Sequence, residues 1–198
     1  MNVDNSLPLG LNWLTEPAAW SLAGDVLTVT AAPRTDVFTD PLGGAARRDA
    51  AMAFTTPPDG DWQFSARLRV GFRSAWDAGA LVVRSDDDHW AKLNFEQAPD
   101  GVPSIYSVVT RGRSDDALAG PVAGDALWLR ISRIAEGFAF HVSDDGDFWR
   151  LVRQFALEGP RPPRVGIEVQ SPVGEGCRVD FDDLHLTPTS LAHLFDGR

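Results

Sequence analysis

The sequence predicts an all-β protein whose two antiparallel sheets pack face to face as a sandwich. Two observations support this fold class. Most of the 198 residues lie in short runs that alternate in polarity or are rich in β-branched residues, and Gly, Pro, Asp and Asn separate these runs as they do in tight turns. No segment combines the length and the 3.6-residue periodicity of a long helix, so alternating strand and helix units are not expected.

The expected strands follow one another along the whole chain. Turn dipeptides such as Asp100-Gly101 and Asp145-Gly146 stand between them. Thr189 or Ser190 is expected to cap a short helix over Leu191–Phe195. We expect strands at Val26–Thr30, Ala50–Thr55, Trp62–Val70, Gly79–Ser85, Trp90–Glu96, Ile105–Thr110, Leu127–Ile134, Gly137–Ser143, Phe148–Phe155, Arg164–Gln170 and Val179–Thr187.

The length and composition of the chain are those of one large sandwich. With 43% hydrophobic and 23% charged residues, the chain is typical of globular proteins that bury a sizeable core. We therefore expect a single domain over residues 1–198, with a short C-terminal extension from about residue 187. The proline-rich piece Gly159–Pro163 is too short to link two domains.

Charge and cysteine usage restrict the partners and the compartment. A formal net charge of −10 repels a phosphate backbone, so nucleic acid is not an expected partner. No apolar stretch approaches the roughly 20 residues of a membrane helix, so no membrane association is expected. The single cysteine, Cys177, cannot form an internal disulfide, and the N-terminus has no secretion signal, so we expect a cytoplasmic protein. A homodimer stays open.

The stretch 90–96 alternates between apolar and polar side chains. Because successive side chains of a strand point to opposite faces, one face is expected to pack in the core and the other to meet solvent. Glu168 and Gln170 alternate with apolar residues in the same way, as does His141. If these strands share a sheet, its outer face is polar and suits a polar ligand. The expected core residues are Ala91, Leu93 and Phe95, and the expected outer residues are Trp90, Lys92, Asn94 and Glu96.

Several segments, taken in order, resemble one known family. They are Asp77–Arg84, Trp90–Glu96, Ser107–Thr110, Ser114-Asp115, Leu127–Arg133, Ser143–Gly146 and Ser171-Pro172. This set, within about Asn12 to Leu186, is similar to the domain of unknown function 1349 family, which belongs to the concanavalin A-like lectin and glucanase superfamily. The resemblance implies a concanavalin A-like jelly-roll sandwich and implies no established reaction. This chain departs from the family pattern at two places, with Thr35-Asp36-Val37-Phe38 in place of Thr-Asp-Phe-Trp and Ser114-Asp115-Asp116 in place of Ser-Asp-Trp, so aromatic positions are weakened or lost.

The polar face and the resemblance together predict a ligand site on the concave sheet. Arg130 is assigned to the ligand side because it shares a strand face with Trp128 and Ser132. Lys92 and Glu96 also suit cross-strand ion pairs on a solvated sheet, and that structural role stays open. The predicted ligand-binding residues are Trp90, Lys92, Asn94, Glu96, Asp36, Ser114, Asp115, Arg130 and Glu168.

Three functions fit these residues. The first is non-catalytic binding of a carbohydrate or small polar metabolite, with or without a regulatory role. The second is a glycan-active enzyme with an unusual carboxylate pair such as Glu96 and Glu168, although the Glu-x-Asp-x-x-Glu and Glu-x-Asp-x-Glu patterns of glucanases on this fold do not occur. The third is a protein-binding scaffold. No metal is expected, because the four histidines lack metal-ligand spacing, and no catalytic residue or cofactor is expected, because neither a Gly-x-Ser-x-Gly elbow nor a Gly-rich phosphate loop occurs.

Overall fold

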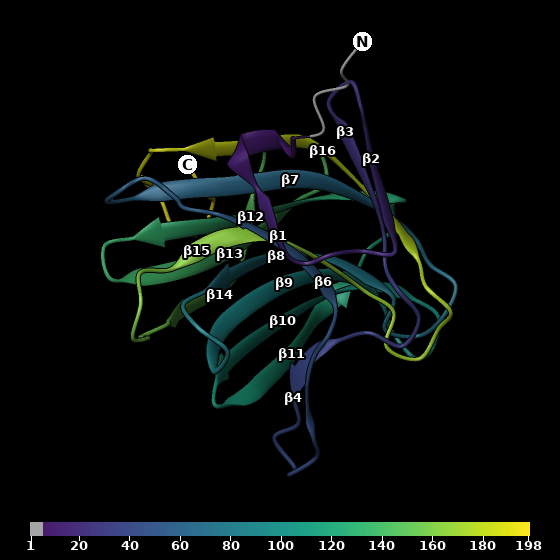
Figure 1. Cartoon of the computed structure of the whole chain (residues 1–198). Coiled ribbons are helices and arrows are strands. Elements are labelled where there is room, and N and C mark those ends of the chain that lie inside the picture. Colours follow the sequence, from purple (N-terminus) through teal and green to yellow (C-terminus); the bar gives the residue numbers. More distant parts are fainter. Residues whose placement is uncertain (1–5) are drawn as a thin grey trace.

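The computed structural model describes residues 6–198 and shows two antiparallel seven-stranded sheets stacked on each other (Figure 1). The first sheet has the order β1 (Asn12–Thr15), β6 (Ala51–Thr55), β15 (Arg164–Gln170), β8 (Ala78–Arg84), β9 (His89–Gln97), β10 (Pro103–Arg111) and β11 (Arg113–Pro121). The second has the order β14 (Arg150–Ala156), β13 (Gly137–Ser143), β12 (Ala126–Ile134), β7 (Trp62–Gly71), β16 (Arg178–Thr187), β3 (Val26–Thr30) and β2 (Ala19–Ala23). The predicted all-β sandwich is confirmed.

A separate hairpin, β4 (Val37–Thr39) and β5 (Ala46–Arg48), lies against the first sheet. In Figure 1 the segment around β4 lies beside β11 at the lower end of that sheet. Two hydrogen bonds attach it there: the Thr39 backbone N–H donates to Ser114 Oγ at 2.9 Å, and Arg113 donates to the Pro41 carbonyl at 2.8 Å. The hairpin therefore covers part of the sheet's outer face.

The sequence pattern missed the weakest strands and one expectation about the C-terminus was wrong. The strands β1, β2, β4, β5 and β11 were not expected, because they are short or mostly exposed and lack a clear apolar alternation. Residues Leu191–Phe195 form no helix; the chain there is irregular and ends in a turn. A single helical turn makes too few hydrogen bonds to offset the cost of nucleation. The only helical element within residues 6–198 is the 3-10 turn Pro8–Gly10, so none is long and apolar enough to span a membrane.

The core lies between the two sheets. Leu81, Leu93 and Phe95 of the first sheet pack against residues such as Phe64 and Leu129 of the second, and all are fully buried. Burial of each such side chain contributes roughly 1.5–3 kcal/mol. The two sheets lie close together at a glycine, since a Cβ on Gly79 would lie 2.5 Å from Cγ1 of Val179. The burial of Ala91, Leu93 and Phe95 in this core confirms the predicted inward face of β9.

The outer face of the first sheet is not the wet surface that the alternation predicts. Its side chains at Trp90, Lys92, Asn94 and Glu96 are only 2%, 2%, 1% and 4% exposed. The hairpin brings Val37 over this face, where it joins a second apolar cluster with Met52, Val82 and Val108. His141 also departs from expectation, because β13 belongs to the second sheet.

Candidate functional site

Lys92 lies at the centre of the outer face of the first sheet. Its Nζ is 2.6 Å from Oε1 of Gln170, 3.3 Å from Oε1 of Glu168 and 3.8 Å from Oδ1 of Asp36. Burial by itself lowers the pKa of the Lys92 ammonium, but Glu168, Asp36 and Glu96 outweigh it and hold that pKa above its usual value. Lys92 is therefore a buried, permanently charged group at neutral pH.

The Lys92–Glu168 pair reaches over an intervening strand. Lys92 stands on β9 and Glu168 on β15, and β8 runs between them. Ala80 of β8 is the Cα partner of both Glu168 and Asn94. Val82 of β8 is the Cα partner of Lys92, so the Lys92 and Glu168 side chains meet diagonally across β8.

Two buried carboxyl groups flank the lysine. Burial raises the pKa of Glu96 to about 8 and the pKa of Glu168 to about 7, and in both cases the Lys92 charge opposes the rise. Glu96 Oε2 accepts hydrogen bonds from Asn94 Nδ2 at 2.8 Å and from Gln170 Nε2 at 3.3 Å. These carboxyl groups change charge close to neutral pH.

Two cavities open at Lys92, one on each side of β4. Val37 lines one and the next residue, Phe38, lines the other, as alternation along a strand requires. The Arg48 cavity, of about 270 Å³, is lined by Leu14, Thr15, Val37, Arg48, Met52, Val82, Arg84, Asp87, Trp90, Lys92 and Glu168. The Trp76 cavity, of about 220 Å³, is lined by Asp36, Phe38, Trp76, Lys92, Asn94, Glu96, Val108, Asp116, Gln170 and Pro172.

Each cavity contains a buried acceptor without a partner. Oδ1 of Asn94, in the Trp76 cavity, and Oε2 of Glu168, in the Arg48 cavity, accept no hydrogen bond within the described part of the chain. Buried polar atoms in folded proteins are nearly always hydrogen-bonded, to protein or to water. Because Asn94 and Glu168 line the cavities, a hydroxyl or amine bound there is a candidate donor for each atom.

Trp76 forms a wall of the second cavity that the sequence analysis missed. Its backbone adopts a φ of 68°, a conformation that bulky residues rarely take. Hydrogen bonds on both sides hold it: Trp76 N–H donates to the Gln97 carbonyl at 2.7 Å, and the Trp76 carbonyl accepts from Gln170 Nε2 at 3.1 Å. Its ring stands edge-on to Tyr106, with centroids 5.8 Å apart. Trp76 precedes its strand, so strand alternation could not reveal it.

The structure brings most of the predicted site residues together. Ser114 is near them but acts on the hairpin, since its hydroxyl accepts from Thr39 and pairs with Thr110 Oγ1 at 2.9 Å. The predicted residues that line one or both cavities are Trp90, Lys92, Asn94, Glu96, Asp36 and Glu168.

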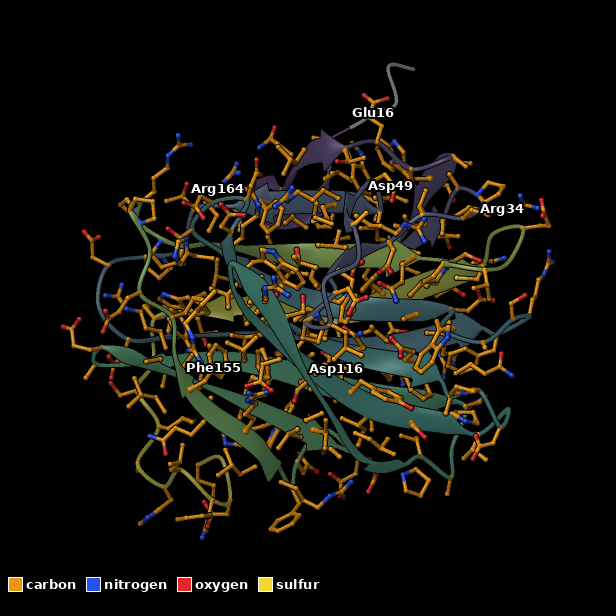
Figure 2. All side chains as sticks on the ribbon, turned by 90° about the horizontal axis from the view of Figure 1, so that it is seen from below. Glu16, Arg34, Asp49, Asp116, Phe155 and Arg164 are labelled. Atoms are coloured by element: carbon orange, nitrogen blue, oxygen red, sulfur yellow. The ribbon has the colours of Figure 1, made fainter. Side chains whose placement is uncertain are left out.

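Asp115 does not face this site, contrary to expectation. Its carboxylate is exposed and pairs with Arg153 at 3.0 Å. Asp116 lines the Trp76 cavity instead, because it is the Cα partner of Val108, which in turn is the partner of Lys92. A shift of one residue along a strand reverses the face. Figure 2 shows Asp116 near the middle of the molecule viewed from below.

Arg130 also lies elsewhere, contrary to expectation. It stands on β12 of the second sheet, where its guanidinium lies 4.1 Å from the Trp149 ring and donates to the Gly197 carbonyl at 2.7 Å. Burial lowers the pKa of Arg130 to about 10. The polar face of β12 is covered by the C-terminal segment and has no contact with the Lys92 cavities.

The two predicted carboxylates line different cavities. Glu168 lines the Arg48 cavity and Glu96 the Trp76 cavity, with Lys92 between them. In retaining glycosidases the two catalytic carboxyl groups lie about 5 Å apart and flank one glycosidic bond of the substrate. Within residues 6–198 no group of three or more His, Cys, Asp or Glu side chains is arranged to hold a metal ion.

Comparison with known families identifies the chain. Residues 13–189 match the family described as "Protein of unknown function (DUF1349)". The chain belongs to the DUF1349 family. This DUF1349 chain is 28% identical over 177 residues to Regulation of enolase protein 1 of Saccharomyces cerevisiae, a match that covers 88% of each protein. A crystal structure of a functionally unknown protein from Saccharomyces cerevisiae has a TM-score of 0.82 at 26% identity, covering 91% of this chain and 97% of that one.

More distant structures share only the fold. The GH43 protein BlXynB from Bacillus licheniformis has a TM-score of 0.75 at 14% identity; the match covers 94% of the DUF1349 chain but 38% of BlXynB. The carbohydrate binding module CBM66 from Bacillus subtilis has a TM-score of 0.57 at 14% identity, with 88% and 94% covered. These likenesses confirm the jelly-roll sandwich.

Proposed function

We propose that this protein binds a carbohydrate or small polar metabolite, without turnover, in the two cavities at Lys92. The observation that carries the proposal is the buried, unpartnered Oδ1 of Asn94 in the Trp76 cavity. A ligand hydroxyl supplies the hydrogen that this acceptor lacks.

The lining of the Trp76 cavity suits a polyhydroxylated ligand. The Trp76 indole offers a flat apolar surface to the C–H groups of a sugar ring, and Asp36 and Asp116 offer acceptors to its hydroxyls. A few polar groups in an apolar setting are typical of small-molecule pockets. The fold likeness to a module named for carbohydrate binding supports the same ligand class.

The arrangement of carboxyl groups favours binding over catalysis. Glu96 and Glu168 line separate cavities with Lys92 between them, unlike the close carboxyl pair of a retaining glycosidase. Glu96 Oε2 is already occupied by Asn94 and Gln170. A ligand held at Lys92 would therefore meet fixed hydrogen-bonding groups rather than a nucleophile and an acid.

A ligand screen with matched tryptophan variants tests the proposal. We expect a carbohydrate and metabolite array, followed by thermal shift and calorimetry, to yield a ligand that raises the melting temperature and is not converted. Trp76→Ala should weaken its binding about tenfold or more, because it removes the stacking wall. Trp128→Ala is the control, since Trp128 is a half-buried tryptophan of the second sheet that lines neither Lys92 cavity. No binding across the array, turnover of the ligand, or equal losses in both variants would contradict the proposal.

A further inference from the structure

Basic side chains gather at the Arg48 cavity although the chain carries a net charge of −10. Arg48, Arg84 and Lys92 line it, against Asp87 and Glu168. In the neighbouring Trp76 cavity the balance is reversed, because Lys92 stands there with three carboxyl groups, those of Asp36, Glu96 and Asp116. The site therefore has a basic end and an acidic end, which meet at Lys92.

An additional arginine stands beside the basic end. Arg164 of β15 is the Cα partner of Arg84 of β8. Like charges directly opposite on neighbouring strands are destabilising. Burial, and then the charges of Arg84 and Arg161, lower the pKa of Arg164 below its usual value. In Figure 2, Arg164 lies toward the edge of the molecule, away from Asp116.

The acidic partners of these arginines are weak. Arg84 pairs with Asp87, and Arg48 with Asp88 at 2.9 Å, but both carboxylates are mostly exposed. Exposed ion pairs of this kind contribute little to stability. Arg164 packs over the Phe54 ring at 5.2 Å and has no carboxylate within 4.0 Å among residues 6–198. The guanidinium groups are thus available to a stronger anion.

We propose that the ligand is an anionic carbohydrate, a sugar acid or a sugar phosphate, whose anionic group binds at Arg84 and Arg48. This inference rests on the proposed function and names the ligand class for the same site. A hydroxyl near the anionic group donates to the unpartnered Oε2 of Glu168. The neutral part of the ligand extends past Lys92 toward Trp76, because the acidic side chains Asp36 and Asp116 of the Trp76 cavity disfavour an anion there.

The size of the site matches a small sugar derivative. The two volumes, about 270 and about 220 Å³, lie just below the ~300–1,000 Å³ typical of small-molecule pockets. Carboxylate and phosphate both match the fork of donors that a guanidinium presents. The shared chemistry is a compact anion on a polyol.

Matched neutral and anionic sugars test this inference by calorimetry on the full chain. The probes are glucose, galactose, their uronates and their 6-phosphates. We expect at least one anionic probe to bind about tenfold or more tightly than its neutral parent, with an affinity that falls as salt rises. Tighter binding of the uronate identifies carboxylate as the anionic group, and tighter binding of the 6-phosphate identifies phosphate.

Variants of the basic end separate this inference from the proposed function. Arg84→Gln should lower the affinity for the anionic probe about tenfold more than the affinity for its neutral parent, whereas Arg84→Lys should retain part of the preference. Arg153→Gln is the matched control, because Arg153 pairs with Asp115 outside both cavities. Melting temperatures establish that each variant folds.

The outcomes are distinct. Equal affinity for neutral and anionic probes, with Trp76→Ala still weakening both, overturns the inference and leaves the proposed function standing. Equal effects of Arg84→Gln and Arg153→Gln also overturn it. If no probe binds and the wider array yields no ligand, both fail.

Discussion

Lys92 Nζ lies 3.3 Å from Glu168 Oε1, and the two side chains are 2% and 0% exposed. Removing one partner of a buried ion pair leaves an uncompensated charge, which costs about 3–5 kcal/mol, whereas replacing both partners costs much less. The pair is therefore both a structural element and part of the site.

We predict that Lys92→Met lowers the free energy of unfolding by about 3 kcal/mol at pH 8, because buried Glu168 must then either stay ionised without its partner or take up a proton at a pH above its pKa of about 7. The loss should be smaller at pH 6, where Glu168 can take up a proton. Adding Glu168→Gln to Lys92→Met should recover most of the loss. Urea denaturation measures the wild type, the two single variants and the double variant, and a double variant as unstable as the sum of the single variants would refute the coupling.

The two buried carboxyl groups predict that the protein becomes less stable from about pH 6.5 to 8.5. The pKa values of Glu96 and Glu168 are raised to about 8 and about 7, so the folded state holds protons that the unfolded state has lost. Their stabilising contribution is complete at acid pH and is lost as pH rises through the folded values. We expect a fall of about 1–3 kcal/mol across this window.

The window begins at about pH 6.5 because His141 changes the stability in the opposite direction below that pH. Burial lowers the pKa of His141 to about 4, so its contribution to stability is complete above about pH 6.5 and is lost on acidification.

Glu96 faces Lys92, Asp116 and Glu168. Denaturation curves at several pH values should show a smaller fall for Glu96→Gln than for the wild type. Stability that rises with pH in the window would contradict the assignment.

The register of β11 predicts different results for two adjacent aspartates. Asp116→Asn should weaken ligand binding, since Asp116 lines the Trp76 cavity, by about 1 kcal/mol or more for the loss of a charged hydrogen-bond acceptor. Asp115→Asn should leave the affinity unchanged, because its carboxylate pairs with Arg153 at the surface. Calorimetry with the ligand from the array compares them, and a larger effect of Asp115→Asn would mean that the register is wrong.

Cys177 should be unreactive in the folded protein. The residue is buried, its Sγ–H donates to the Gln170 carbonyl at 3.2 Å, and burial raises the pKa of the thiol to about 12. The thiolate is the reactive form, so iodoacetamide should label the native protein at least about 100-fold more slowly than the urea-unfolded chain. Mass spectrometry follows the labelling, and rapid modification of the native protein would disprove the assignment.

The alternation of residues 90–96 was enough to divide their side chains between two faces. Leu93 and Phe95 pack in the core, and Lys92 and Glu96 share the opposite face, because the two-residue period is a property of the extended backbone. The same local pattern could not show that this face is covered. The covering strand β4, Val37–Thr39, has only three residues and no recognisable period of its own.

Sequence alone determined the fold class and the inward or outward direction of side chains along the stronger strands. Tertiary structure decided that Lys92 reaches Glu168 across β8, that Asp116 rather than Asp115 faces the cavity, and that Arg130 belongs to the other sheet. It also decided the place of Trp76, which lies outside any strand. Alternation is set by neighbouring residues, whereas strand order, register and covering layers are set by contacts between segments far apart in the chain.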